Sequence, residues 1–410
     1  MFGWFKKKSA SYSLENLAAE VIDVAQKHYP KDQFTYDKKM NEVFSVSGDS
    51  PKTYLGNIFN AVKDMSPEDR ETYLEDFFKT GKLSSSDLTL ETLKSFLLTR
   101  VRTSSELGLR DFILSSMSSE AKNREFFSVK IGELFFDLTV DYGSSLSTPP
   151  KSDLINAGGG DEAVLDIALQ NLKKISQGVH WQKVSPHIWY STYEDDYDAA
   201  RLVCLYPEYD LPDGVNNPIA YMPSHSDCLI TDKDDPETLA LLIQKGDEFA
   251  GNSRKLSKAL WYNKNAGWHS LKLDETHPSH SIVQNQWTME TASFYEEQKE
   301  QLENALLKEN KDIFVASVMM AKEEGNETIF SYSVLTFGVD TLLPKTDRIA
   351  FVDPDKPEKE QFLGMMPWHA FAEILGADNF TRYESLTPVR FHFPNGVKKD
   401  GRPKIKQHFE

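Results

Sequence analysis

Cysteine is scarce in this sequence, and long apolar runs are missing. Only Cys204 and Cys228 occur in 410 residues, too few for a disulfide framework and not spaced as a Cys-x-x-Cys metal knuckle. The longest apolar stretch, residues 313–321, has nine residues even with Ser317 counted, whereas a membrane-spanning helix needs about 20. The sequence therefore excludes a disulfide-stapled domain, predicts no transmembrane segment and fits a cytoplasmic location.

Positive charge is also in short supply. The 46 Lys and Arg residues face 63 Asp and Glu residues, which gives a net charge of −17. A general nucleic-acid-binding protein needs a basic face against the phosphates, so we expect no nucleic acid partner. The excess of acidic residues instead favours a partner with a basic protein surface.

The amino terminus lacks the residue order of a secretory signal. Phe2, Trp4 and Phe5 precede three lysines, and no apolar segment follows. These rings and lysines are of the kinds that contact an anionic membrane surface, so a peripheral membrane protein is one alternative. The other is a frayed terminus or packing of the rings on the domain.

The 40% apolar content is enough for packed cores, and its spacing predicts an α+β fold. Ser13 and the Ser66-Pro67 pair are typical helix starts, and apolar residues at helical spacing follow each of them. The predicted elements of this first part are a helix closed by Pro30, a hairpin at 34–46, a helix at 51–62, a helix from 67 and a helix at 89–102.

Strand patterns dominate from residue 126 onward, and a polar stretch at 274–281 predicts a linker. We therefore expect a module at 12–272, with a helical half at about 12–115 and a mixed-sheet half at about 126–272. A smaller C-terminal α+β unit at 282–410 ends in a basic tail. The expected elements are strands at 127–131, 134–140, 188–193, 200–206, 219–222 and 228–231, a loop at 143–160, helices from 161, 236, 289 and 367, and a hairpin across Gly325-Asn326.

Short segments between residues 12 and 272, among them YLGNIF (54–59), ALQNL (168–172) and YDAARL (197–202), resemble the bacterial YtpQ-like family, a family of unknown function. The resemblance implies a cytoplasmic bacterial α+β protein and supplies no catalytic residues. It departs from the family pattern at 224–226, where Ser-His-Ser replaces a shorter segment with an arginine. The matching segments are YLGNIF (54–59), PEDR (67–70), GEL (132–134), VD (140–141), ALQNL (168–172), YDAARL (197–202), IAYMP (219–223) and DCLI (227–230).

The tripeptide His225-Ser226-Asp227 contains the residue types of a hydrolase triad. Neighbours on an extended chain point to opposite sides, so these three cannot form a triad among themselves. The sequence also has no Gly-x-Ser-x-Gly elbow. A hydrolase would need His225 or Ser226, or nearby acids, to meet other residues across the fold; the alternative is a polar turn.

Three histidines, His269, His277 and His280, lie close in sequence with carboxylates between them. Imidazole and carboxylate are ordinary zinc ligands, yet the spacing matches no zinc pattern. We expect solvated side chains rather than a metal site. No cofactor is predicted either, because the glycines at 158–160 precede two acids that would repel phosphate.

The strongest candidate contact surface is the acidic loop Glu194, Asp195, Asp196 and Asp198. Removing several carboxylates from water is costly, so most should stay exposed and face a basic partner. A calcium loop is the alternative, but its glycine and distal glutamate are missing. We expect Asp198 to pair with Arg201 locally.

Many well-formed core patterns and no converging set of reactive groups favour a non-catalytic cytoplasmic interaction protein. The alternatives are the hydrolase with His225 or Ser226 and the peripheral membrane protein. The two cysteines are expected to be small buried side chains within apolar strands.

Overall fold

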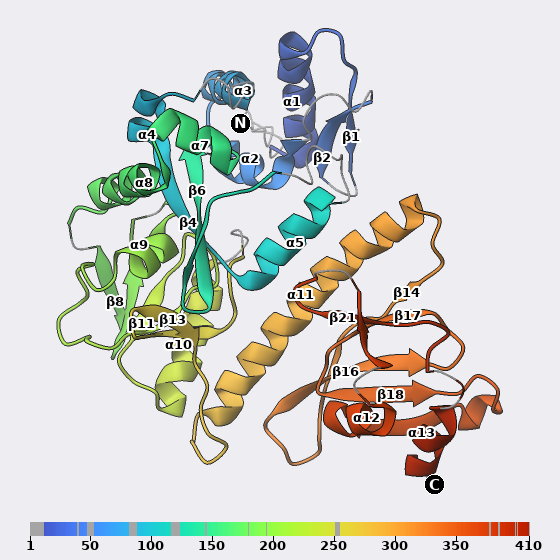
Figure 1. Cartoon of the computed structure of the whole chain (residues 1–410). Coiled ribbons are helices and arrows are strands. Elements are labelled where there is room, and N and C mark those ends of the chain that lie inside the picture. The colour runs from blue at the N-terminus through green and yellow to red at the C-terminus, as the bar shows by residue number, and fades with distance from the viewer. Residues whose placement is uncertain are drawn as a thin grey trace, which may run out of the picture. The chain divides into compact units, whose positions relative to one another are not determined.

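The computed structural model describes residues 12–38, 41–46, 53–81, 88–115, 124–143, 146–178, 180–193, 195–250, 255–376, 379–383, 386–397, 399 and 401–409. These residues confirm the α+β class. They fall into two compact units, whose elements are labelled in Figure 1. Unit 1 comprises Met1–Leu98 and Leu138–Asn171, and unit 2 comprises Thr99–Asp137 and Leu172–Glu410.

Unit 1 is mainly helical. The predicted start of its first helix is confirmed, because the Ser13 hydroxyl accepts a hydrogen bond from the Asn16 backbone N–H and the Asn16 side chain accepts one from the Ser13 N–H. Its predicted hairpin is confirmed as well, with β1 antiparallel to β2. The elements are α1 (Leu14–His28), β1 (Phe34–Asp37), β2 (Glu42–Ser45), β3 (Thr53–Tyr54), α2 (Leu55–Val62), α3 (Pro67–Gly81), α4 (Leu90–Phe96), β7 (Leu146–Ser147), α7 (Lys151–Gly158) and most of α8 (Asp161–Ile175).

In the sequence, the boundaries between the two units do not coincide with the ends of helices or strands. The boundaries fall within β4 (Leu97–Arg102), β6 (Leu134–Asp141) and α8. Strand β4 corrects the predicted helix at 89–102, which ends at Phe96. The reason is that residues 97–101 are all buried, so they lack the exposed face of an amphipathic helix.

The first half of unit 2 is built on an antiparallel sheet in the order β13-β12-β10-β11-β9-β8. Helix α10 packs on this sheet through Leu239, Leu242 and Ile243. The elements are α5 (Ser104–Ser115), β5 (Ser128–Ile131), β8 (Trp181–Ser185), β9 (Ile188–Ser191), α9 (Asp198–Leu205), β10 (Ile219–Tyr221), β11 (Leu229–Thr231), α10 (Pro236–Ala250), β12 (Leu260–Lys264) and β13 (Gly267–Ser270).

The second half of unit 2 follows the long helix α11 (His280–Lys308). The predicted hairpin across Gly325-Asn326 is confirmed, with β15 antiparallel to β16. The sheet orders are β14-β17-β21-β20 and β15-β16-β18-β19. The elements are β14 (Phe314–Val315), β15 (Met319–Lys322), β16 (Ile329–Thr336), β17 (Thr341–Pro344), β18 (Arg348–Val352), a 3-10 turn (Glu358–Glu360), β19 (Phe362–Pro367), α12 (Trp368–Leu375), β20 (Thr381–Arg382), β21 (Arg390–Phe393) and α13 (Arg402–Phe409).

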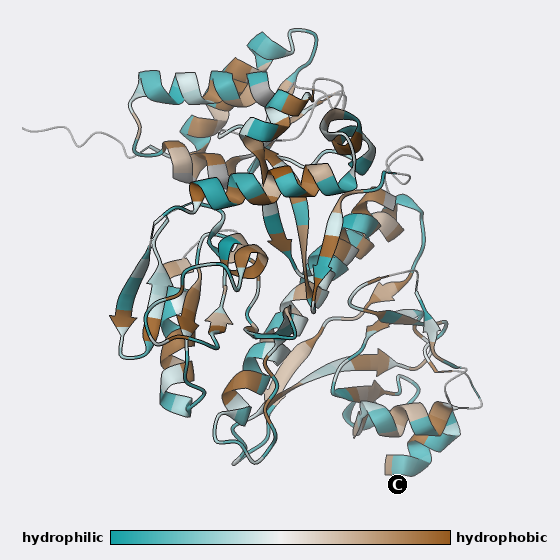
Figure 2. Cartoon of the chain, turned by 60° about the vertical axis from the view of Figure 1, so that its left-hand side comes forward, coloured by the Kyte–Doolittle hydropathy of each residue, from teal (hydrophilic) through white to brown (hydrophobic). Residues whose placement is uncertain are grey.

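Two further predictions of local structure are wrong. Residues 200–206, expected as a strand, lie largely in α9, which is buried at almost every position; a fully buried run carries no periodicity to separate helix from strand. Residues 143–160, expected as a loop, include α7. Figure 2 shows hydrophobic and hydrophilic residues mixed along the partly exposed helices, the pattern that makes such elements recognisable.

The polar stretch at 274–281 is not a linker between units, since residues on both sides belong to unit 2. The Ser279 hydroxyl donates to the Asp234 carbonyl oxygen at 2.5 Å, and His277 lies 3.5 Å from the Asp234 carboxylate. The stretch is therefore a turn bonded to the start of α10. None of the helices in the described parts of the chain combines the length and apolar character needed to cross a bilayer.

Helix α11 is fastened to the C-terminal strands by Arg390, whose side chain is fully buried. Its Nε donates to Gln298 Oε1 at 2.7 Å, and its terminal nitrogens donate to the carbonyl oxygens of Ala316, Leu342 and Tyr295. Burial lowers the pKa of Arg390 to about 10, so the group stays charged at neutral pH. The basic tail thus supplies a core residue.

Replacing Arg390 with Met should lower the free energy of unfolding by about 3–5 kcal/mol, because several buried acceptors lose their donor. Urea denaturation at neutral pH measures this. Arg348→Met is the matched control, since Arg348 is 34% exposed and paired with Glu323; its cost should be below about 1 kcal/mol. Equal effects of the two substitutions would contradict the role of Arg390.

Candidate functional site

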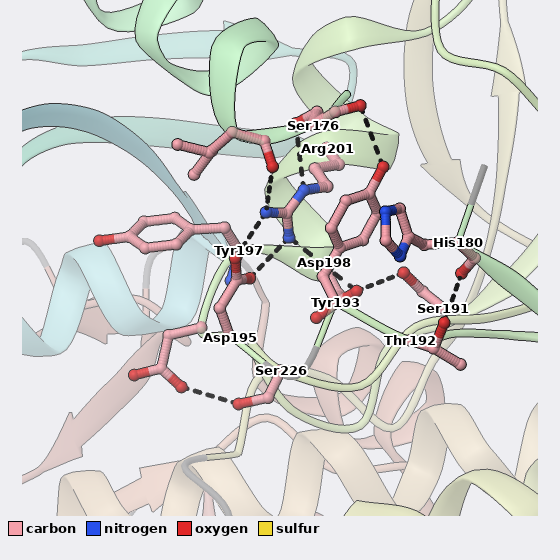
Figure 3. A network of polar contacts seen from close by, with 12 residues as sticks. Ser176, His180, Ser191, Thr192, Tyr193, Asp195, Tyr197, Asp198, Arg201 and Ser226 are labelled. Carbon is pink, nitrogen blue, oxygen red and sulfur yellow. Dashed lines mark hydrogen bonds and ion pairs between the residues drawn. The ribbon is translucent and has the colours of Figure 1, made fainter. Parts of the chain in front are cut away.

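The predicted acidic loop is organised by a buried arginine (Figure 3). The Arg201 side chain is fully buried. It donates to both carboxylate oxygens of Asp195, at 2.6 and 2.5 Å, and to the Ser176 hydroxyl at 3.0 Å. Its guanidinium carbon lies 3.7 Å from the ring centroid of Tyr193. Burial opposes the charge, but the bonds to Asp195 raise the pKa of Arg201 above its usual value.

Asp198 lies inside the fold rather than on a contact surface, which corrects the prediction for this residue. Only 1% of it is exposed. Its carboxylate accepts a hydrogen bond from the Ser191 hydroxyl and lies 4.0 Å from Arg201, so the predicted local pairing is confirmed. Burial raises the pKa of Asp198 to about 7. This aspartate is therefore largely neutral just below neutral pH.

The remaining loop residues differ in their surroundings. Asp195 is only partly exposed and is engaged by Arg201, so its carboxylate stabilises the loop. Asp196 is exposed and accepts a hydrogen bond from the Ser226 hydroxyl at 2.7 Å. Glu194 lies outside the described residues. A contact role for Asp196 stays a prediction.

The three hydrolase candidates contact different partners. His225 is 2% exposed, with Nε2 3.9 Å from Glu106 Oε1. The Ser226 hydroxyl turns to Asp196, as described above. Asp227 accepts hydrogen bonds from Ser224 and from the Tyr190 hydroxyl. The Ser226 hydroxyl therefore donates to Asp196 rather than to His225.

The three histidines considered for a metal site are likewise separate. His269 lies 3.7 Å from Glu133, His277 faces Asp234, and His280 Nδ1 donates to the Leu273 carbonyl oxygen at 2.8 Å. Within the described ranges, no group of three His, Cys, Asp or Glu side chains is arranged to hold a metal ion.

The cysteines sit in unreactive surroundings. Cys228 is fully buried, as predicted, but it precedes β11 instead of lying in a strand. Cys204 is partly buried and lies in α9 rather than in a strand. Burial raises the pKa of Cys204 to about 12 and that of Cys228 well above its usual value. Neither thiol is set up to form a thiolate.

A cavity of about 880 Å³ lies within unit 2, lined by α5, α11, the end of α10 and residues 255–258. Helices α5 and α11 contact each other, and both are labelled in Figure 1. The apolar lining includes Leu107, Ile113, Leu256 and Phe294. The charged lining consists of Arg102, Arg110, Lys255 and Lys258 with Glu106, Asp247, Glu290 and Glu297.

Glu290 is the most buried carboxylate of this lining, with 6% exposed. Its Oε2 accepts hydrogen bonds from the Ser257 hydroxyl, at 2.6 Å, and from the Ala259 backbone N–H. Burial raises the pKa of Glu290 to about 7, and the charge of Glu106 adds to the shift. A buried carboxyl that titrates near neutral pH in a cavity marks a candidate functional site.

Sequence reasoning did not single out the residues of this cavity. The available signal was spacing: Arg102, Glu106 and Arg110 recur every fourth residue, and Glu290 and Glu297 are seven apart. At helical spacing the members of each set share one face, although Arg102 itself ends β4 just before α5. That α5 and α11 come together, however, depends on contacts between residues far apart in the chain.

Comparison of the chain with protein-family models, with curated proteins and with solved structures finds no match in any of the three. The resemblance to the YtpQ-like family therefore stays a prediction. The case for function depends on the geometry of unit 2.

The raised pKa of Asp198 has a consequence for stability. Between about pH 4 and pH 7 the folded state holds a proton that the unfolded state has lost, so this residue favours folding more as the pH falls. Asp198→Asn removes the titration. The free energy of unfolding of the wild type minus that of the variant should rise by about 1–3 kcal/mol from about pH 8 to about pH 5.

Urea denaturation at a series of pH values measures this difference. Asp196→Asn is the control: Asp196 is exposed, and its substitution should give a difference that hardly changes with pH. A flat difference for Asp198→Asn as well would show that the Asp198 carboxylate is ionised throughout this range.

Proposed function

We propose that this protein is a non-catalytic binding protein and that the cavity of unit 2 receives a segment of a protein partner. The carrying observation is the cavity itself, whose volume of about 880 Å³ is that of a pocket able to enclose a ligand group, about 300–1,000 Å³ for small-molecule pockets. Its apolar side chains come from two helices and a loop, so they would surround an inserted group on several sides.

The charged lining favours a polypeptide over a small metabolite. Small-molecule sites hold few polar groups, whereas four basic and four acidic side chains border the mostly apolar wall of this cavity. Apolar anchors bordered by charges of both signs are typical of protein interfaces. This proposal keeps the expected interaction protein and moves its main contact from the acidic loop to the cavity.

The alternatives receive less support. A hydrolase using His225 or Ser226 is disfavoured, because these residues and Asp227 are bonded to different partners. The membrane-surface contact of Phe2, Trp4 and Phe5 falls outside the described residues. A cytoplasmic location and a bacterial origin stay predictions.

Site-specific photo-crosslinking tests the proposal. Phe294 lines the cavity, and replacing it with the photoreactive analogue p-benzoylphenylalanine should give a discrete adduct with a partner on irradiation of the producing cells. The same analogue at Trp287 is the control, because Trp287 lies on α11, is 39% exposed and does not line the cavity.

The adduct at position 294 should disappear when Leu107→Arg places a charged side chain in the cavity. Gel mobility and mass spectrometry of the crosslinked species provide the measurement. An adduct that forms equally at position 287, or that survives Leu107→Arg, would place the partner elsewhere on the molecule. Absence of any adduct at position 294 would also contradict the proposal.

A further inference from the structure

Most of the cationic side chains that line the cavity form ion pairs with carboxylates of unit 2. Once Asp137 is counted, four basic side chains face five carboxylates. The ion pairs of these cations are Arg102–Asp137 at 2.9 Å, Arg102–Glu106 at 3.4 Å, Arg110–Asp111 at 3.2 Å, Arg110–Asp137 at 3.5 Å and Lys258–Asp247 at 3.7 Å. These pairs leave little positive charge for the other acids of the cavity.

Glu290 and Glu297 are the carboxylates left over. Neither has a cationic side chain within ion-pair distance among the described residues. The hydrogen bonds to Glu290 come from uncharged donors. Partial burial raises the pKa of Glu297, and the charge of Lys255 acts against this larger effect without an ion pair between the two side chains. Glu290 is buried and Glu297 is exposed, so together they extend negative charge from the solvent into the cavity.

The two glutamates also share one side of α11. A separation of seven residues is close to two helical turns, or about 10 Å along the axis. Phe294 lies between them in sequence and lines the same cavity. Leu107 and Ile113 supply apolar surface from α5. A ligand group that satisfies this site must combine an aliphatic body with a positive charge at its end.

We propose that the cavity selects a lysine side chain of the bound partner, with the ammonium group at Glu290, the aliphatic stem on the apolar wall and Glu297 guiding its entry. This inference rests on the proposed function, because it names what the cavity recognises in the inserted segment. It also fits the charge of the whole chain, −17, which favours basic partners.

Lysine fits this site better than arginine. Its four-carbon stem packs along apolar surface while its compact ammonium group makes up to three hydrogen bonds. A guanidinium group needs a planar, two-pronged acceptor. One oxygen of Glu290, Oε2, is already bonded to Ser257 and Ala259, so a two-pronged contact with free oxygens is not available there.

A pair of matched peptides tests the inference. The first is acetyl-Leu-Lys-Leu-Leu-amide, and the second replaces lysine with norleucine, which keeps the stem and lacks the ammonium group. Titration of the full chain, followed by NMR or calorimetry, should show the lysine peptide binding about tenfold more tightly or better, the effect of one charged hydrogen bond.

Two substitutions separate the roles of the glutamates. Glu290→Gln keeps an oxygen acceptor for Ser257 and Ala259. In this variant the lysine and norleucine peptides should bind with about equal affinity. Glu297→Gln should reduce the preference for the lysine peptide about two- to threefold, mainly at low salt. Glu303→Gln, on the same helix and outside the cavity lining, should leave the preference unchanged. Unchanged binding of the norleucine peptide shows that each variant retains an intact cavity.

Proton release gives an independent readout. A bound ammonium group stabilises the ionised carboxylate and lowers the pKa of Glu290 from about 7, so the lysine peptide should release protons at neutral pH and the norleucine peptide should not. Calorimetry in phosphate and in Tris buffers detects this. The other titratable or charged groups around the cavity are Glu106, Arg102, Arg110, Asp247, Lys255, Lys258, Glu297, the carboxylates Asp137 and Asp111 that pair with the arginines, and, next to Glu106, His225.

Equal binding of the two peptides would overturn the lysine inference while leaving a binding role for the cavity, which the photo-crosslinking tests separately. A preference for lysine that persists in Glu290→Gln would also overturn it, as would tighter binding of an arginine peptide. If neither peptide binds, lysine is not the group recognised.

Discussion

The buried guanidinium of Arg390 is the constraint on which unit 2 depends most. A charge taken fully out of water is tolerated only when its donors are satisfied. Here the acceptors come from α11, from the segment before β15 and from β17. Because no single element supplies enough acceptors, the guanidinium is stable only when all three are in place. The position of α11, and with it the position of Glu290, follows from that requirement.

A second buried arginine, Arg201, is stabilised by an ion pair instead. It is paired with the Asp195 carboxylate and stacked on Tyr193, so its charge is neutralised within a short stretch of chain. Asp195 cannot serve both as the counter-ion of a buried cation and as a free contact for a partner. Charge density in a sequence therefore indicates where carboxylates gather, whereas the surroundings of each one decide whether it stabilises the fold or faces a partner.

The parts of the fold predicted correctly from the sequence are those with local chemical signals. The capping box at Ser13 and the Gly-Asn pair of the β15–β16 hairpin each act within a few residues. Predictions failed at α9 and β4, where nearly every side chain is buried and long-range packing decides between helix and strand. The candidate site was missed for the same reason. Glu106 and Glu290 are 184 positions apart in the numbering, and only folding brings their helices together.

The electrostatics of the cavity also support the proposed binding role over a catalytic one. A hydrolytic site needs a nucleophile or an activated water beside its acid and base, and the hydroxyl of Ser226, the one considered for this role, is bonded to Asp196. Glu290, by contrast, is protonated for part of the time at neutral pH, because burial raises its pKa to about 7. Among the described residues no cationic side chain forms an ion pair with it. A ligand cation beside Glu290 would stabilise its ionised carboxylate and so offset the free-energy cost of burying that charge. The offset would contribute to the binding free energy of the ligand.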